Sequence, residues 1–163
     1  MSDTFGVCEI IEMGMEIEKN GRDFYAALAH RTHDHALAEL FTLLGKEEEK
    51  HIRAFGAIRE AVRVCEEERT SDEYFAYMNA LAGKHVFIRQ GKGNDIASKV
   101  TGPGDALDTA LSFEVDSIVF FEGMRDAVPS ASRHIVEELI AQEKQHVVKL
   151  NEMKKGVSDG KEG

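Results

Sequence analysis

The sequence predicts an all-α protein, a four-helix bundle with a long, partly helical crossover between its second and third helices. Proline occurs only at Pro103 and Pro129, so little of the chain is barred from a helix. Apolar residues recur at three-and-four spacing over long stretches, which is the period of one helix face. The 163 residues, 42% of them hydrophobic, suffice for a single domain with its own core.

The negative net charge of the chain argues against negatively charged binding partners. Lysine and arginine number 20 against 30 aspartate and glutamate, a formal net charge of -10, so nucleic acid and anionic membrane are not expected partners. No window of about 20 apolar residues could span a bilayer. Asp3, Glu9 and Glu12 stand where a secretory signal would need a basic start and an apolar run. We therefore expect a cytoplasmic protein.

The two cysteines, Cys8 and Cys65, lie singly in helical patterns, and no Cys-x-x-Cys pair occurs. This spacing excludes a disulfide framework, a zinc ribbon and a rubredoxin-type iron site. We expect both thiols to lie in the core.

The first half of the chain predicts a helical hairpin. One apolar stripe predicts a helix over residues 3–31, and a second predicts a helix from about residue 37 to the acidic run 66–68. Thr32, His33 and Asp34 lie between the stripes and suit a turn or an N-cap. Because this connection is short, the two helices should be antiparallel neighbours.

Residues 69–104 form the predicted crossover. Ser71 can cap a shorter amphipathic helix that reaches Leu81, and a glycine-rich connector follows over residues 91–104. A helix of about 25 residues is about 37 Å long, and roughly a dozen extended residues recross that length, so the crossover can return to the starting end. Three aromatic residues are expected to pack the crossover or a dimer surface: Tyr74, Phe75 and Tyr77.

The second half predicts another hairpin. Asp105 and Asp108 resemble a capping box at the start of a helix that continues up to Pro129. A further stripe over residues 135–153 predicts the fourth helix. The predicted parts of the chain are a bundle domain over residues 1–155 and a flexible C-terminal tail over residues 156–163.

The two hairpins resemble each other in sequence, and the resemblance extends to polar residues inside the apolar stripes. Each hairpin has a Glu in its first helix and a Glu-x-x-His in its second. A shift of 96 residues relates the two single Glu, and a shift of 95 relates the two Glu-x-x-His segments. All six side chains are therefore expected to point inward: Glu18, Glu48, His51, Glu114, Glu143 and His146.

The six side chains are also expected at one level of the bundle. Residues that lie level in a hairpin are equally far from its turn. The midpoint between residue 18 and residues 48–51 falls near Asp34, and the midpoint between residue 114 and residues 143–146 falls near Pro129. Both positions are turns predicted independently from composition, so each hairpin should bring one Glu opposite one Glu-x-x-His.

Four carboxylates and two imidazoles inside a bundle would each cost several kcal/mol if left charged and unpaired. The one cation in a stripe slot at this level is Arg22, and it cannot neutralise four carboxylates. Two divalent cations would balance four negative charges, with neutral imidazoles completing each coordination sphere. Ligands of this mixture, without thiolate, favour iron or manganese over a structural zinc site.

A Glu from each of two helices with Glu-x-x-His from each of the other two is the pattern of di-iron and di-manganese carboxylate bundles. The chain resembles rubrerythrin-type members of the ferritin-like superfamily on residues 18–25, 48–51 and 143–146, and the resemblance covers roughly residues 5–154. It implies a ferritin-like fold with two iron ions, for which manganese or zinc could substitute on isolation. It assigns Glu18 and His51 to one iron, Glu114 and His146 to the other, and Glu48 and Glu143 to both.

The resemblance also implies an activity. That family reduces hydrogen peroxide or reacts with dioxygen by cycling between diferrous and diferric states, and Tyr25 would act in catalysis as the hydrogen-bond donor that orients a carboxylate. Full-length rubrerythrins carry a four-cysteine rubredoxin domain, which the residues here do not provide, so an external electron donor such as rubredoxin is required. Rubrerythrins also have a carboxylate three residues after the Glu that matches Glu114. This chain has Ser117 there, which indicates a more symmetric site.

Three functions remain open on the sequence. The chain could be a di-iron peroxidase or oxidase, an iron-binding ferroxidase that handles Fe(II) oxidation, storage or delivery, or a metal-free scaffold. A homodimer is expected, whereas storage would need a hollow shell. Glu47 and Glu49 are assigned to an exposed charged face. Three histidines near the first turn are expected to be surface residues rather than an accessory metal site: His30, His33 and His35.

Overall fold

The computed structural model describes residues 6–63, 71–85, 88 and 90–159. The helices of this part of the chain are α1 (Val7–Arg31), α2 (His35–Arg63), α3 (Asp72–Lys84), α4 (Lys92–Lys99), α5 (Pro103–Arg125) and α6 (Arg133–Asp159), with a 3-10 turn, η2 (Ser130–Ser132), before α6. No strand occurs within those ranges, in agreement with the all-α prediction. None of the described helices combines the length and apolar character that crossing a membrane requires.

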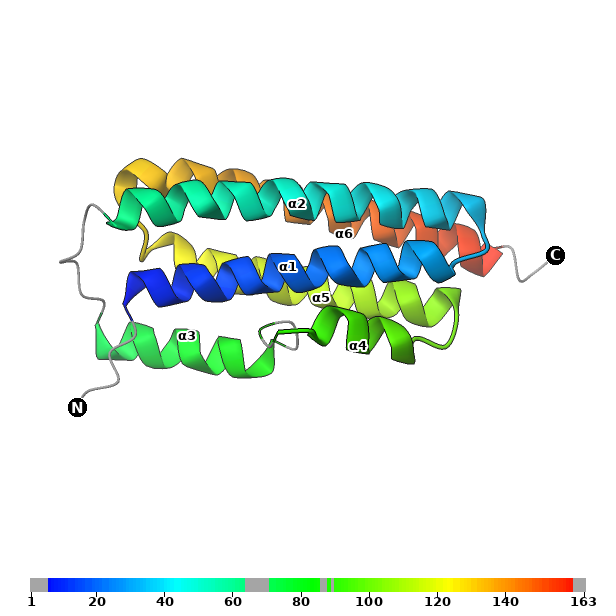
Figure 1. Ribbon diagram of the computed structural model, residues 1–163, viewed down its shortest axis with the longest axis horizontal. Coiled ribbons are helices and arrows are strands. Elements are labelled where there is room, and N and C mark those ends of the chain that lie inside the picture. The colour runs from blue at the N-terminus through cyan, green and yellow to red at the C-terminus, as the bar shows by residue number, and fades with distance from the viewer. Residues whose placement is uncertain (1–5, 64–70, 86–87, 89, 160–163) are drawn as a thin grey trace.

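The four long helices form two antiparallel hairpins that face each other through a common core (Figure 1). α1 packs along α2 and α5 along α6, and the hairpins meet where α1 contacts α5 and α2 contacts α6. The core between them is rich in aromatic rings: Phe24, Tyr25, Phe41, Phe55, Phe113, Phe120 and Phe121 are at most 2% exposed. The chain thus has the predicted topology of a four-helix bundle with one long crossover.

The first turn joins α1 to α2 in three residues. The Thr32 backbone N–H donates to the Leu28 carbonyl at 3.0 Å and closes α1, and the Asp34 carboxylate accepts from the Leu37 N–H at 2.8 Å at the start of α2. The outer ends of the two predicted helices, residues 3–5 and 64–68, lie outside the described residues.

In the crossover, α3 begins where the sequence predicts. The Ser71 hydroxyl accepts from the Tyr74 N–H at 3.2 Å, which confirms the predicted cap. α3 packs on α5, where the Tyr74 hydroxyl donates to the Gly123 carbonyl at 2.5 Å. Tyr74 therefore serves the packing of the crossover, while Tyr77 stays 51% exposed.

The second crossover helix, α4, is absent from the sequence prediction, which assigned these residues to a glycine-rich connector. Gly91 precedes α4 in the left-handed region, at φ 78°, which glycine adopts without steric cost. Gly93 donates its N–H to the Asn20 side-chain oxygen at 3.1 Å, and a Cβ at Gly93 would lie 2.0 Å from the Asn20 carbonyl oxygen. Docking on α1 therefore stabilises a helix too short to show a clear apolar period.

The boundaries of the second hairpin differ from the prediction at three points. The predicted capping box at Asp105 is wrong, because α5 begins at Pro103, whose fixed φ suits the first helical position, and Asp105 instead accepts from the Thr101 N–H at 2.9 Å. α5 ends at Arg125 rather than at Pro129. α6 continues to Asp159, so residues 156–159, predicted to lie in the tail, extend the last helix.

Cys8 is a free thiol of intermediate exposure that packs against the edge of the core. The prediction of a core position therefore holds only in part, because Cys8 is only partly buried. Cys65, the other predicted core thiol, lies outside the described residues.

Candidate metal centre

The structure places all six predicted polar residues in the interior, as their positions in the apolar stripes require. One comes from α1, two from α2, one from α5 and two from α6. The burial of so many ionisable groups is costly unless they are paired or coordinate an ion. Their exposures are 0% for Glu18, Glu48, Glu114, Glu143 and His146, and 1% for His51.

These side chains form two groups, each with ligand atoms within 4.8 Å of one another. Both groups contain Glu48 and Glu143. Glu18 and His51 complete the first group, and Glu114 and His146 complete the second. Two carboxylates are therefore placed to be shared by two neighbouring ions.

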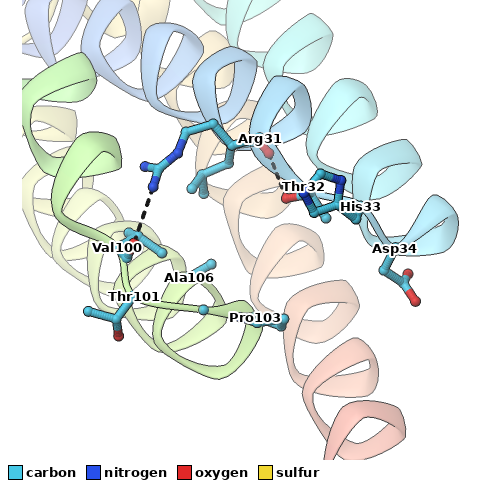
Figure 2. A pocket seen from close by; sticks show the side chains of 10 residues that line it. Arg31, Thr32, His33, Asp34, Val100, Thr101, Pro103 and Ala106 are labelled. Carbon is cyan, nitrogen blue, oxygen red and sulfur yellow. Dashed lines mark hydrogen bonds between the residues drawn. The ribbon is translucent and has the colours of Figure 1, made fainter.

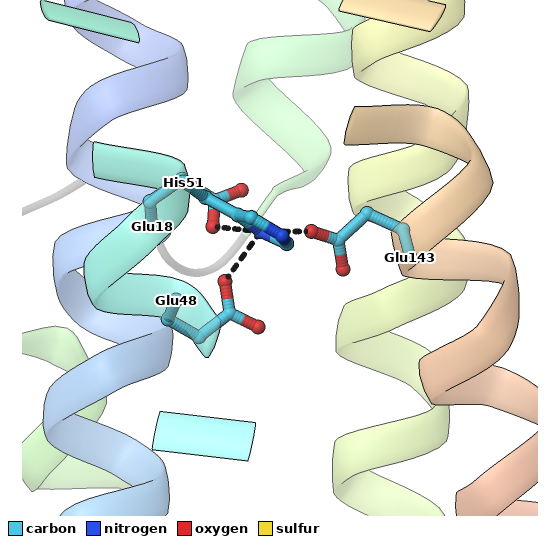
Figure 3. A group of neighbouring side chains, drawn as sticks. All are labelled: Glu18, Glu48, His51 and Glu143. Carbon is cyan, nitrogen blue, oxygen red and sulfur yellow. Dashed lines mark hydrogen bonds and ion pairs between the residues drawn. The ribbon is translucent and has the colours of Figure 1, made fainter. Parts of the chain in front are cut away.

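In the first group, three carboxylates converge on one imidazole nitrogen (Figure 3). His51 Nδ1 lies 2.7 Å from Glu143 Oε1, 3.1 Å from Glu18 Oε2 and 3.3 Å from Glu48 Oε2. A ring nitrogen carries at most one hydrogen, so it cannot satisfy three acceptors. The convergence of three carboxylates on one nitrogen is consistent with a candidate metal site.

The second group repeats this arrangement. His146 Nδ1 lies 3.2 Å from Glu143 Oε2, 3.4 Å from Glu114 Oε1 and 3.5 Å from Glu48 Oε1. The rings of His51 and His146 stack, with centroids 5.5 Å apart and planes inclined by 14°. The two nitrogens that face the carboxylates are thus the same atom, Nδ1, in both halves.

Several buried atoms of the cluster have no hydrogen-bond partner, although most buried polar atoms in proteins do. Such atoms mark a place where a cation would supply the missing interaction. Oxygen and nitrogen donors without thiolate suit iron or manganese, so the residues fit a pair of such ions. The unpartnered atoms are Glu18 Oε1, both oxygens of Glu48, Glu114 Oε2, both oxygens of Glu143, and His146 Nδ1.

The four carboxyl groups divide into two electrostatic classes. Burial, reinforced by the neighbouring carboxylates, raises the pKa of Glu18 and Glu114 well above the usual range. Burial also acts to raise the pKa of Glu48 and Glu143, but the close approach of a neighbouring carboxyl group and of both imidazoles lowers it overall. Negative charge is therefore concentrated on the two carboxylates that the groups share.

The pKa values of the two imidazoles are also set by a competition between burial and neighbouring charge. Burial alone would lower the pKa of His51 and His146, but the surrounding carboxylates raise both values overall. Without metal, protons on the imidazoles therefore offset the charge of Glu48 and Glu143. Metal ions would displace these protons, since imidazole binds metal in its neutral form.

Tyr25 reaches the cluster from α1, and its hydroxyl donates to Glu114 Oε1. The carboxylate that it contacts thus belongs to the second hairpin rather than to its own helix. Burial, followed by the charge of Glu114, raises the pKa of Tyr25 well above its usual range, so the hydroxyl keeps its proton. A glycine allows the helices to meet here: a Cβ at Gly21 would lie 2.6 Å from Phe113 Cζ.

The outer nitrogens of the two imidazoles contact two residues, Gln142 and Glu47, that the sequence pattern did not place in the site. His51 Nε2 lies 2.7 Å from Gln142 Oε1, and His146 Nε2 lies 2.6 Å from Glu47 Oε2. The assignment of Glu47 to an exposed face is therefore wrong. Its side chain is 26% exposed, because it contacts His146 and Lys149 of α6. Gln142 and Glu47 each directly precede a Glu of the cluster, a signal that the sequence contained.

His85 is buried beside α5, one turn beyond Glu114. Its Nε2 lies 3.1 Å from the Ser117 hydroxyl, which itself donates to the Phe113 carbonyl at 2.9 Å. His85 therefore acts as the donor to Ser117. At the position where the family resemblance would place a further carboxylate, the chain has a serine fixed by this histidine.

A pH prediction follows from His85, because burial lowers its pKa from 6.5 to about 4. Between these values the unfolded chain binds a proton that the folded chain does not, so the free energy of unfolding should fall as the pH falls from 6.5 to 4. The contribution of His85 should reach about 3 kcal/mol. Urea unfolding of wild type and His85→Gln across this range measures it, because the other titrating groups are common to both proteins.

The matched control for this prediction is His35→Gln, since the His35 side chain is 88% exposed and meets water in the folded chain. An equal loss of stability on acidification in wild type and His85→Gln would contradict the prediction.

A surface cavity of about 290 Å³ lies at the first turn, between residues 31–34 and residues 100–106 (Figure 2). Arg31 donates to the Ala97 carbonyl and, at 3.5 Å, to the Val100 carbonyl, so its cation serves to hold the crossover. His33 is the histidine of the lining. Among the residues that the structure describes, no group of metal ligands includes His30, His33 or His35.

No family model and no curated protein matches the sequence. A crystal structure from Thermotoga maritima, described as that of a proposed ferritin-like diiron-carboxylate protein, matches with a TM-score of 0.74 and 23% identity, over 95% of this chain and 98% of that chain. A likeness at this identity establishes the fold. The prediction of a ferritin-like helical bundle is therefore confirmed.

Proposed function

We propose that this chain is a non-haem di-iron oxidoreductase that reduces hydrogen peroxide or dioxygen with electrons from an external donor. The observation that carries the proposal is the pair of buried ligand groups that share Glu48 and Glu143, with unpartnered atoms at the place where two ions would lie. The description of the Thermotoga maritima protein as a diiron-carboxylate protein supports the same chemistry.

The ligand sets follow from the two groups. Glu18 and His51 would hold one iron, Glu114 and His146 the other, and Glu48 and Glu143 both. When bound, a ferrous pair supplies the two electrons that, with two protons, convert one hydrogen peroxide into two waters, and the donor returns two electrons to the pair. A two-metal site thus matches the two-electron demand of the O–O bond.

Tyr25 would have two roles in such a centre. Its hydroxyl donates to Glu114 and so fixes the orientation of that carboxylate. Its ring packs against Phe24, Phe41 and Phe113, with centroids 5.3, 6.1 and 6.1 Å away, which closes this side of the cluster to water. Tyr25 therefore holds a proton next to the site within an apolar wall.

The external donor is proposed to be a separate one-electron carrier such as rubredoxin. A rubredoxin-type iron requires four thiolates, and these 163 residues contain two cysteines. The bundle therefore cannot supply such a carrier site from its own side chains.

The proposal is tested by metal analysis and anaerobic stopped-flow spectroscopy. Protein loaded with Fe(II) should hold two iron ions per chain, and one hydrogen peroxide should oxidise both of them. Addition of reduced rubredoxin should restore the ferrous state and sustain turnover. Protein that binds no transition metal would refute the proposal and favour the metal-free scaffold.

The same experiment distinguishes the ferroxidase alternative. An iron-storing protein would oxidise many more than two Fe(II) per chain and retain the product inside a hollow assembly. Light scattering of the iron-loaded protein measures that assembly directly. A 24-subunit cage that accumulates ferric iron would replace the oxidoreductase proposal with iron storage.

A further inference from the structure

The two imidazoles of the cluster are braced in the same way but by chemically different partners. In each half, the residue that precedes a shared Glu reaches across to the outer nitrogen of the opposite histidine: Gln142 to His51 at 2.7 Å and Glu47 to His146 at 2.6 Å. With Nδ1 facing the carboxylates, Nε2 carries the hydrogen and donates outward. One imidazole thus donates to a neutral amide oxygen and the other to a carboxylate.

The internal repeat shows that this difference is a departure from symmetry. The shift of 95 residues that superimposes the Glu-x-x-His segments places Glu47 on Gln142 and Lys149 on Ala54. Lys149 Nζ lies 3.7 Å from Glu47 Oε1. The partner of His146 is therefore a carboxylate with a cation nearby. The partner of His51 is an amide, and the position that matches the cation is occupied by an alanine.

A second departure from the repeat affects the same ligand group, the one that contains Glu114 and His146. The shift of 96 residues places Tyr25 on Phe121, so the tyrosine that donates to Glu114 has no counterpart for Glu18. Both single-residue differences thus fix ligands of the group that contains Glu114 and His146. The other group has neither the charged imidazole partner nor the tyrosine donor.

A carboxylate partner makes an imidazole a stronger metal ligand than an amide partner does. The negative charge stabilises the partial positive charge that the ring acquires when Nδ1 binds a cation, and it fixes the ring orientation. Loss of such a partner typically costs 10- to 100-fold in metal affinity. The neutral Gln142 can provide orientation but not the charge.

We infer that the two metal positions are inequivalent, and that the Glu114–His146 position binds a divalent cation more tightly and therefore fills first. Glu47 is the positioning residue that sets this order. The inference rests on the proposed two-metal centre. It assigns the main part of the difference between the positions to residues 47 and 142, whose side chains contact the outer nitrogens of the two histidines.

The test is an anaerobic titration of metal-free protein with Co(II), followed by calorimetry and visible absorption. Wild type should bind two Co(II) in steps that differ at least tenfold in affinity, with distinct spectra. Glu47→Gln should weaken the tighter step by 10- to 100-fold, so that the steps merge. Gln142→Glu should strengthen the weaker step by a similar factor, a gain that a merely structural role would not produce.

The double exchange, Glu47→Gln with Gln142→Glu, should restore two separate steps with the order of the two spectra reversed. Glu49→Gln is the matched control, because Glu49 is 41% exposed and pairs with Arg22 at 3.0 Å, and it should leave both steps unchanged. Two Co(II) bound with equal affinity in wild type, or an unchanged ratio in both single variants, would overturn the inference and leave the two-metal centre intact. Failure of wild type to bind two Co(II) would overturn both.

Discussion

Glu48→Ala and Glu143→Ala are each expected to reduce the bound iron from two ions per chain to one or none. Each carboxylate belongs to both ligand groups, so one substitution removes a ligand from both ions at once. Neither lost oxygen can be replaced from solvent without admitting water to a site where both residues are 0% exposed. Metal analysis after anaerobic loading with Fe(II) and desalting measures the stoichiometry.

Two further variants sharpen this result. His51→Ala removes a ligand from the first group alone, so it should mainly weaken one ion and leave the other bound. Glu49→Ala, next in sequence to Glu48 but directed toward Arg22, should keep both ions. Two irons retained in both Glu48→Ala and Glu143→Ala would contradict the shared role of these carboxylates.

Metal loading is expected to produce the largest change in the stability of the fold. An ion that binds only the folded chain, at a free concentration 1,000 times its dissociation constant, adds about 4 kcal/mol to the free energy of unfolding. Two ions should therefore raise the midpoint of thermal unfolding by roughly 15–30 °C in a protein of this size. The gain should increase with pH, because the ligands release protons on binding.

Differential scanning calorimetry of the metal-free and Fe(II)-loaded protein, under anaerobic conditions, measures this gain. Glu143→Ala is the matched comparison, and its unfolding midpoint should respond much less to Fe(II). Coincident transitions of wild type with and without metal would show that the cluster does not bind iron in the folded chain.

The sequence predicted the parts of the structure that depend on a regular period. Stripes at three-and-four spacing located the four long helices, and the same stripes showed that residues such as Glu18 and His146 point inward. The repeat then placed the inward residues at one level. These inferences succeed because a helix face is a property of spacing alone.

The remaining features depend on how separate helices meet. α4 is stabilised by its contact with Asn20 of α1 rather than by its own eight residues. The contact of Glu47 with His146 requires the relative rotation of α2 and α6, which no single stripe determines. The start of α5 was missed because Asp105 has the composition of a cap but reaches back from inside the helix to Thr101.

The departure from symmetry at residues 47 and 142 has an evolutionary consequence. If the bundle were assembled from two identical hairpins on separate chains, any mutation would change both histidine partners together, and the two positions could never differ. Fusion of the hairpins into one gene frees each copy to mutate alone. A duplicated ancestor with the same residue at both positions would have given the two histidines equivalent partners, and one substitution at either position would be enough to make those partners differ.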